Sequence, residues 1–236
     1  MTRLISTIQW DIRLQFRNGF YYASAFVAVV SILFLAQLQL SPEILALLLP
    51  AIILQNVLIN SFYFIAGLVL LEKGEGTLEG IVVSPLRRWE YLLSKVVTLT
   101  LLSILESLAI IIFLYGLGFN LLFMIIGLAL LGIFFALAGF IAVARYDSIN
   151  TFLLPSVLMV TALSLPLLDY FGIWRSPLMY LHPIQAPLLL MKAAFQPVAL
   201  WQLGYGVLYS GLWIGLAYRW SQRAFYRFVI LKEGVR

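Results

Sequence analysis

The chain contains no cysteine and only one histidine, His182, among its 236 residues. The absence of cysteine excludes disulfide bonds, thiolate metal sites and cysteine nucleophiles. A lone histidine supplies neither a metal cluster nor a triad, and the patterns H-E-x-x-H and G-x-S-x-G do not occur. The sequence also lacks G-x-x-x-x-G-K-S/T, the loop that cradles ATP phosphates. We therefore expect a chain that is not itself an enzyme and that binds no metal or cofactor.

Charged residues are scarce as well, because they make up 11% of a chain that is 63% hydrophobic. In soluble domains about a quarter of the residues are charged. No soluble fold could bury this much apolar surface, so the lipid bilayer must be the solvent. The longest polar segments have about twenty residues, which is too short to fold alone. We expect one membrane domain over residues 1–236, without a cleavable signal, because Arg13 and Arg17 interrupt the N-terminal pattern.

Six apolar runs are long enough to cross a membrane, since about 20 such residues span the hydrocarbon core. The sequence therefore predicts an all-α polytopic membrane protein with six transmembrane helices. Residues 1–18 precede the first run and place Ile8 and Ile12 on one apolar face, which is typical of an amphipathic interfacial helix. A plain cytosolic leader is the alternative. The six runs are 20–39, 47–71, 91–115, 119–143, 149–168 and 199–219.

The segment 169–198, before the last run, is apolar but is broken by prolines, among them Pro177, Pro183 and Pro187. The pieces between the prolines are too short to cross the bilayer. We expect two short helices that form an outer re-entrant hairpin. An apolar loop on the outer headgroups is the alternative.

Lysine and arginine are distributed unevenly over the loops. With the N-terminus inside, only Arg175 and Lys192 of the 15 basic residues lie outside. The positive-inside rule therefore predicts a multi-pass protein of the cell membrane with both termini in the cytoplasm. The net charge of +5 follows from this orientation, so we expect no nucleic acid as a partner. The basic residues near the C-terminus, such as Arg223, are expected to contact anionic lipid headgroups.

Five polar residues inside the second and third runs are candidates for a translocation path or a subunit interface. Asn56 and Asn60 share one helical face, and Ser103 and Ser107 accompany Glu106. Helix–helix hydrogen bonding within one subunit is the alternative. Glu106 lies near the middle of the bilayer, where an acid needs a partner, a proton or a water-filled cavity. For Glu106, a functional role and a buried structural hydrogen bond both stay open.

Two further features concern packing and ligand contact. The pairs Gly211/Gly215 and Gly132/Gly139 predict faces of close helix contact, within or between subunits. His182 is interpreted as a surface or interfacial side chain, with contact to an exported ligand as the alternative.

One charged stretch, 72–90, interrupts this apolar chain with four acidic and three basic residues. It must lie in water, where it can meet a soluble partner. Thr77 can cap a short helix over 78–83, and Pro85 disfavours helix at the residue before it. Because apolar runs flank the segment on both sides, such a helix can carry force from a partner into the bilayer.

The charged stretch resembles the cytoplasmic loop of ABC-2-type transporter permeases, which has an acid-rich entry, G-T/S-L-E and then S-P before the third span. The layout of the whole chain is similar to theirs as well. The resemblance implies that this segment is a cytoplasmic coupling helix that docks on an ATPase. The residues implied in coupling are Glu72, Glu75, Gly76, Thr77, Leu78, Glu79, Ser84 and Pro85, together with Arg87 and Arg88 of the same segment.

The resemblance further implies the permease subunit of an ABC exporter, a homodimer or heterodimer bound to two separate ATPase subunits that carry the ATP and Mg. Drug exporters of the fluoroquinolone or daunorubicin type are nearest among compact relatives, so a hydrophobic or amphipathic cargo is expected. Export of haem, glycan or lipid is the alternative. A secondary transporter or channel, or a membrane scaffold, would need no ATPase; for a secondary transporter, only Glu106 supplies the expected charge deep within a span.

Overall fold

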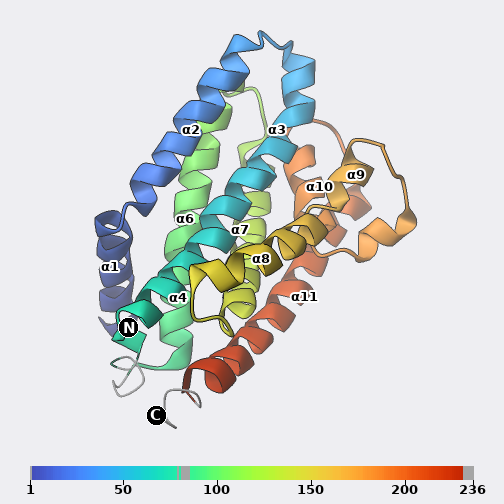
Figure 1. Cartoon of the computed structure of the whole chain (residues 1–236). Helices are drawn as coiled ribbons and strands as arrows, with labels where there is room; N and C mark the ends of the chain where they lie inside the picture. Colours follow the sequence, from blue (N-terminus) through green and yellow to red (C-terminus); the bar gives the residue numbers. More distant parts are fainter. Residues whose placement is uncertain (1, 79, 81–85, 231–236) are drawn as a thin grey trace.

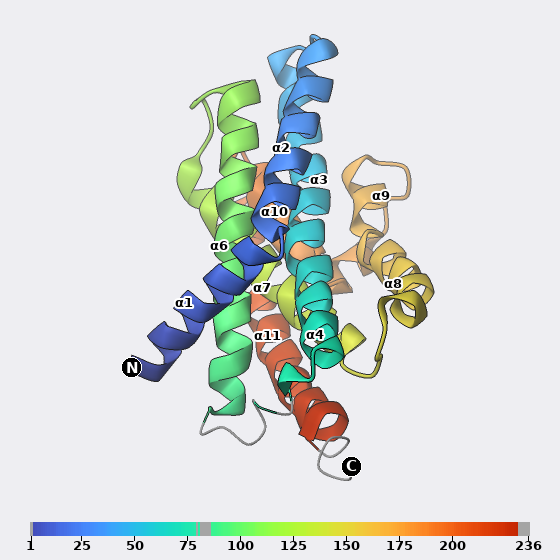
Figure 2. The same cartoon turned by 60° about the vertical axis from the view of Figure 1, so that its left-hand side comes forward.

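The computed structural model describes residues 2–78, 80 and 86–230, and within these ranges it consists of helices without strands (Figure 1). This confirms the predicted all-α class. The first helix, α1 (Thr2–Arg17), meets the long α2 (Phe20–Gln37) at Gly19, whose φ of 83° lies in the region that favours glycine. Figure 2 shows α1 leaving the bundle at an angle, whereas α2 follows the long axis.

The α1 helix buries two polar residues and Leu14 against the bundle and leaves much of its apolar surface exposed. Asp11 and Gln15 are buried against α6, whereas Ile5 and Phe16 are more than half exposed. An amphipathic helix with a free apolar face is suited to lie on a membrane surface, as the sequence predicts for this segment.

The second predicted run forms one long rod made of three pieces: α3 (Pro42–Leu58), the π-helical turn η1 (Ile59–Tyr63) and α4 (Phe64–Gly74). The rod begins earlier than the predicted residue 47, because the Ser41 hydroxyl accepts from the backbone N–H of Ile44 and proline suits the first turn. The π turn was not predicted.

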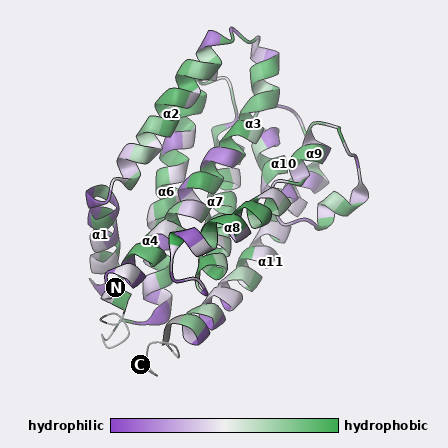
Figure 3. Ribbon diagram, in the orientation of Figure 1, coloured by the Kyte–Doolittle hydropathy of each residue, from purple (hydrophilic) through white to green (hydrophobic). Residues whose placement is uncertain are grey.

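The next three runs become α6 (Arg88–Tyr115), α7 (Leu121–Val143) and α8 (Ile149–Leu163), with the short α9 (Pro166–Tyr170) after α8. Side-chain caps set two of these starts, since Asn120 accepts from the first turn of α7 and Ser148 from that of α8. Figure 3 shows apolar residues along most of α2, α3, α7 and α8.

The sixth predicted run lies within α11 (Leu200–Phe225), which continues into the π-helical η3 (Tyr226–Ile230). In the described part of the chain, five helical stretches are long and apolar enough to cross a membrane, and α11 is not among them. Its tyrosine, tryptophan, glycine and glutamine content makes it less apolar than the others. Five of the six predicted spans are therefore supported by length and composition.

The segment 169–198 contains two short helices, η2 (Pro177–Leu181) and α10 (Gln185–Ala193). Helix α10 is packed between α7 and α11, with Gln185–Met191 buried. Glycine permits this packing: a Cβ at Gly127 would lie 2.8 Å from Met191 Cγ, and one at Gly206 would lie 2.6 Å from Leu190 Cγ. This part of the segment is thus inserted into the bundle and is not a surface loop.

The outer faces of the bundle carry apolar side chains. Only Ser24, Ala28 and Leu35 are buried on α2, and Phe26 and Phe34 on its outer side are 69% and 64% exposed. Such a surface is compatible with lipid as the solvent. Figure 1 places α1 and the end of α11 at the same end of the bundle as the end of α4 and the beginning of α6.

Candidate functional site

A buried charge cluster joins the three helices that surround the charged segment. Lys95 Nζ on α6 lies 2.8 Å from Asp11 Oδ1 on α1 and 2.7 Å from Glu72 Oε1 on α4. The Tyr91 hydroxyl donates to Glu72, and the Ser94 hydroxyl donates to Asp11. Lys95, Asp11 and Glu72 are 1%, 3% and 5% exposed. We call these five residues the charge cluster.

The charge cluster places two carboxylates around a single ammonium group, with each carboxylate oxygen hydrogen-bonded. Because a buried pair that loses one partner leaves an uncompensated charge, these contacts hold α1, α4 and α6 in fixed register. Beside the cluster lies a cavity of about 380 Å³, lined by Trp10 and Arg17 of α1 and by Glu75 and Thr77.

The residue after Glu72 makes a second set of contacts on the other side of α4. Lys73 Nζ donates to the carbonyl oxygens of Ala144 at 2.6 Å and Tyr146 at 2.7 Å, and it lies 3.8 Å from Asp147. A lysine at these carbonyls caps the C-terminal end of α7. The end of α4 is therefore tied to α1 and α6 through Glu72 and to the α7–α8 connection through Lys73.

The predicted coupling residues are placed differently from one another. Glu75, Gly76 and Thr77 are exposed, and Gly76 has a φ of 69°. Leu78 is buried, as is Glu72 within the charge cluster. The Thr77 hydroxyl donates to the carbonyl oxygen of Glu72 at 3.1 Å.

Arg87 and Arg88 are exposed at the beginning of α6, and the Arg88 guanidinium lies 4.6 Å from the centre of the Tyr226 ring. Glu79, Ser84 and Pro85 lie outside the described residues, as does most of the predicted helix over 78–83.

A second polar cluster lies within the predicted membrane region, where α2, η1 and α6 meet. The Ser24 hydroxyl donates to Glu106 Oε2 at 2.6 Å, and the Asn60 amide donates to the same oxygen. Ser61 and Ser103 share a hydrogen bond of 2.9 Å on the neighbouring turn. We call Ser24, Asn60 and Glu106 the membrane carboxyl cluster.

Of the five predicted intramembrane residues, the structure brings Asn60, Ser103 and Glu106 to this junction as helix–helix hydrogen bonds within one chain. Asn56 and Ser107 are buried nearby, but Asn56 Nδ2 and Ser107 Oγ have no hydrogen-bond partner in the described residues. None of the five lines the apolar cavity described next.

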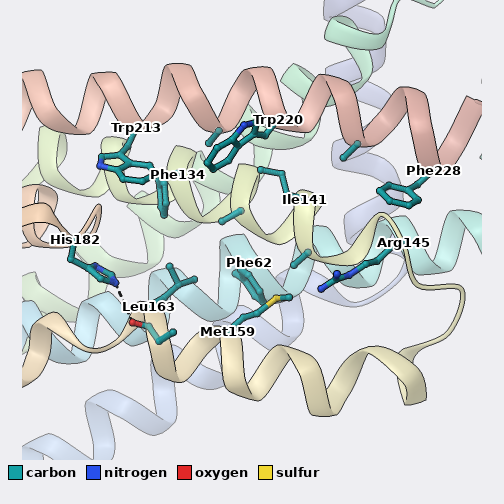
Figure 4. Close-up of a pocket in the computed structure, with 15 residues that line it drawn as sticks. Phe62, Phe134, Ile141, Arg145, Met159, Leu163, His182, Trp213, Trp220 and Phe228 are labelled. Carbon is teal, nitrogen blue, oxygen red and sulfur yellow. Dashed lines mark hydrogen bonds between the residues drawn. The ribbon is translucent and has the colours of Figure 1, made fainter.

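An apolar cavity of about 490 Å³ lies between α7, α8 and α11 (Figure 4). Aromatic side chains from four elements, η1, α7, α11 and η3, form much of its wall, and Figure 4 shows His182 at one end and Arg145 at the other. Its volume is in the range of pockets that hold drug-sized ligands, about 300–1,000 Å³. The aromatic lining residues are Phe62, Phe134, Trp213, Trp220 and Phe228.

The imidazole of His182 is fixed at the rim of this cavity in one neutral form. The backbone N–H of Ile184 donates to Nδ1 at 3.2 Å, so Nδ1 carries no hydrogen, and Nε2 lies 3.1 Å from the carbonyl oxygen of Ala162. Burial lowers the pKa of His182, and the bond to Ala162 opposes this only in part. His182, interpreted from the sequence as a surface or interfacial side chain, is half-buried and lines the cavity, and its contact with an exported ligand stays a prediction.

Other residues of the candidate site were not predicted from the sequence. Asp11 and Tyr91 were not singled out, although an acid on the polar face of an amphipathic helix and a lysine at the start of a span, Lys95, are signals for a buried pair. The aromatic residues of the cavity carry no signal of their own, because tryptophan and phenylalanine are common throughout this sequence.

The comparison with known proteins agrees with this architecture. The model of the family described as the Fluoroquinolones export permease protein family matches residues 2–233. Two proteins named Fluoroquinolones export permease protein, from Mycobacterium tuberculosis strains CDC 1551/Oshkosh and ATCC 25618/H37Rv, are each 33% identical to the chain over the full length of both sequences. This is consistent with the compact ABC-2-type drug-export permease that the charged stretch indicated. The chain belongs to the Fluoroquinolones export permease protein family.

Proposed function

We propose that the chain is the membrane-spanning subunit of an ATP-driven exporter that moves amphipathic aromatic compounds, of the fluoroquinolone kind, out of the cell. The single observation that carries this proposal is the aromatic cavity between α7, α8 and α11 in a member of an export permease family. Ring faces offer stacking partners for a flat aromatic ligand. Arg145 at one end adds a cation for an anionic group on such a ligand.

In this proposal α11 is the sixth span. Its 26 residues extend about 39 Å at a rise of 1.5 Å per residue. That is longer than a hydrocarbon core of about 30 Å. An even number of spans puts both termini on one side, and the distribution of basic residues makes this the cytoplasm.

The charged segment 72–90 is proposed to receive work from a separate ATPase subunit. Two permease copies would bind two ATPase subunits, and those subunits would hold the ATP and Mg. The exposed Glu75, Gly76 and Thr77 would make direct contact, whereas Glu72 would act from inside, through the charge cluster. Movement of the segment would reach the cavity through Lys73, whose contacts hold the connection that carries Arg145.

The test is transport by proteoliposomes that contain the permease and its partner ATPase. We expect fluoroquinolone uptake into inside-out vesicles that requires ATP and stops when the ATPase is omitted. Uptake driven by a proton gradient without ATPase would instead indicate a secondary transporter, the alternative for which the sequence supplies only Glu106 as a charge deep within a span. Haem, a lipid and a glycan serve as competing cargoes, and preference for one of them would reject the proposed substrate class.

A further inference from the structure

The membrane carboxyl cluster brings an acid together with two neutral polar groups far from water. Glu106 and Asn60 are 6% and 1% exposed, and Ser24 is 1% exposed. Each comes from a different element: α2, η1 or α6. Such residues are costly within a membrane unless every charge is compensated.

No positive charge compensates Glu106 in the part of the chain that the structure describes. The ion pairs there involve Lys73 and Lys95 instead. Lys95 lies eleven positions earlier on α6, about 16 Å along the axis, and it is already held by two carboxylates.

Apart from Glu43 at the start of α3 and Glu72 and Lys73 near the end of α4, the helices α2, α3, α4 and α7 carry no charged residue. The sequences 20–37, 44–71 and 121–143 contain no Asp, Glu, Lys, Arg or His. The titratable groups of these three sequences are all tyrosines, namely Tyr21, Tyr22 and Tyr63, and α6 itself adds Tyr91 and Tyr115. None of these five tyrosines is hydrogen-bonded to Glu106 in the described residues.

The hydrogen-bond inventory at Glu106 is unbalanced for an ionised carboxylate. Oε2 is approached by both Ser24 and Asn60, but Oε1 has no partner in the described residues, and neither has Asn60 Oδ1. The oxygen and nitrogen of a side-chain amide are assigned from their partners. Turning the Asn60 amide over brings Oδ1 against Glu106 Oε2, and two such oxygens attract only if a hydrogen lies between them.

We infer that Glu106 is a proton-binding site within the membrane: it holds a proton as a neutral carboxylic acid and donates it to Asn60 Oδ1. The same oxygen, Oε2, accepts from the Ser24 hydroxyl. The bound proton thus removes the uncompensated charge and ties α2, η1 and α6 together. This goes beyond the proposed export function and does not depend on it.

The membrane carboxyl cluster and the aromatic cavity share one element, η1. The π turn η1 supplies Asn60 to the membrane carboxyl cluster and Phe62 to the aromatic cavity. Gly139 of α7 allows α7 to pack closely against the turn, since a Cβ there would lie 2.5 Å from the Phe62 carbonyl oxygen. The hydrogen bond between protonated Glu106 and Asn60 therefore also helps to position Phe62 in the cavity wall.

Infrared spectroscopy of the full-length permease in lipid nanodiscs at neutral pH tests the inference. In the difference spectrum between wild type and Glu106→Gln, we expect loss of a carboxylic-acid C=O stretching band. The matched control is Glu43→Gln at the exposed start of α3, which should remove carboxylate bands only. A Glu106→Gln spectrum that loses only carboxylate bands would overturn the inference.

Thermal unfolding supplies a second readout if one variant folds poorly. Glutamine resembles the neutral acid and can donate to Asn60, so Glu106→Gln should keep the wild-type unfolding midpoint, whereas Glu106→Ala should lower it. Asn60→Ala should lower the midpoint in wild type but add little to Glu106→Ala, because the tie is already lost. A Glu106→Gln midpoint as low as that of Glu106→Ala would contradict a neutral acid.

Discussion

The ammonium group of Lys95 lies 2.7 Å from the carboxylate of Glu72, so the two helices on either side of the charged segment are joined by a buried ion pair. Glu72 lies two residues before the end of α4, and Lys95 is the eighth residue of α6. The ion pair therefore holds the two ends of the segment close together, and the contact of Lys95 with Asp11 connects α1 to them.

Replacement of Lys95 should be among the most damaging changes in the protein. Lys95→Met leaves two buried carboxylates without their cation, and removal of one partner from a buried pair costs about 3–5 kcal/mol. We expect a lower unfolding midpoint in detergent by scanning fluorimetry. The triple variant Lys95→Met, Asp11→Asn, Glu72→Gln removes all three charges and should recover most of the loss. No recovery would argue against charge as the cause.

Glu75 should separate coupling from stability, because it is exposed and lines the cavity beside the charge cluster. Glu75→Lys is expected to keep the unfolding midpoint but to weaken ATPase binding by about tenfold, as a change of about 1.4 kcal/mol in contact energy would. Copurification and drug-stimulated ATP hydrolysis measure this. Glu43→Lys, an exposed change at the other end of the rod, is the control that should alter neither.

The cavity wall predicts a difference between two tryptophans of α11. Trp220 lines the cavity, whereas Trp201 is 61% exposed and does not line it. Trp220→Leu should weaken fluoroquinolone binding by about tenfold, since an aromatic contact contributes about 0.5–1.5 kcal/mol beyond its burial. Trp201→Leu should bind as wild type does. Equal affinities of the two variants, measured by ligand-induced fluorescence quenching, would place the ligand elsewhere.

His182 predicts a pH dependence of stability. Its folded-state pKa is lowered, so the unfolded chain binds the proton more readily, and stability falls as the pH decreases below the ordinary histidine value of about 6.5. Protonation of Nδ1 would also break the bond from Ile184. His182→Asn can keep an acceptor near Nδ1 without titrating, so its unfolding midpoint should change less between pH 7 and 5. A parallel decline in both proteins would assign the effect to other groups.

Two glycines test the packing of the π turn. A Cβ at Gly139 would lie 2.5 Å from the Phe62 carbonyl oxygen, whereas a Cβ at Gly211 would meet nothing within 4 Å. Gly139→Ala should destabilise by about 1–3 kcal/mol through overpacking. Gly211→Ala should stay within about 0.5 kcal/mol for the single chain. Chemical unfolding of both variants in the same detergent compares them.

The sequence predicted the large features of the fold because lipid solvation imposes simple rules. Five apolar runs and the charged segment between two of them are visible from composition alone. The prediction of close helix contact is confirmed within the chain for Gly132 and Gly139, whereas a Cβ at Gly211 or Gly215 would meet nothing within 4 Å in the described residues, so contact of that face with another subunit stays a prediction. Glycine spacing reveals a surface that permits close approach and not the presence of a neighbour.

Tertiary contacts were beyond the reach of the sequence. Glu72 was interpreted from its loop, yet its partners Tyr91 and Lys95 lie across a connection, and Asp11 lies more than sixty positions away. Helix α10 was predicted as part of a re-entrant hairpin. Its insertion between α7 and α11, however, depends on glycine at positions 127 and 206, where a Cβ would be too close to Met191 and Leu190. Each of these depends on pairing between distant segments, which a local pattern does not encode.

The π turn η1 changes how the second span must be read along its length. A π turn accommodates one residue more than the regular repeat, and each residue rotates the helix by about 100°. The faces of α3 and α4 are therefore offset, so one helical wheel drawn through the whole rod misplaces the residues on one side of the π turn by about 100°. A relative that lacked one residue here could keep both ends of the rod, but it would turn a different stripe of side chains toward α6.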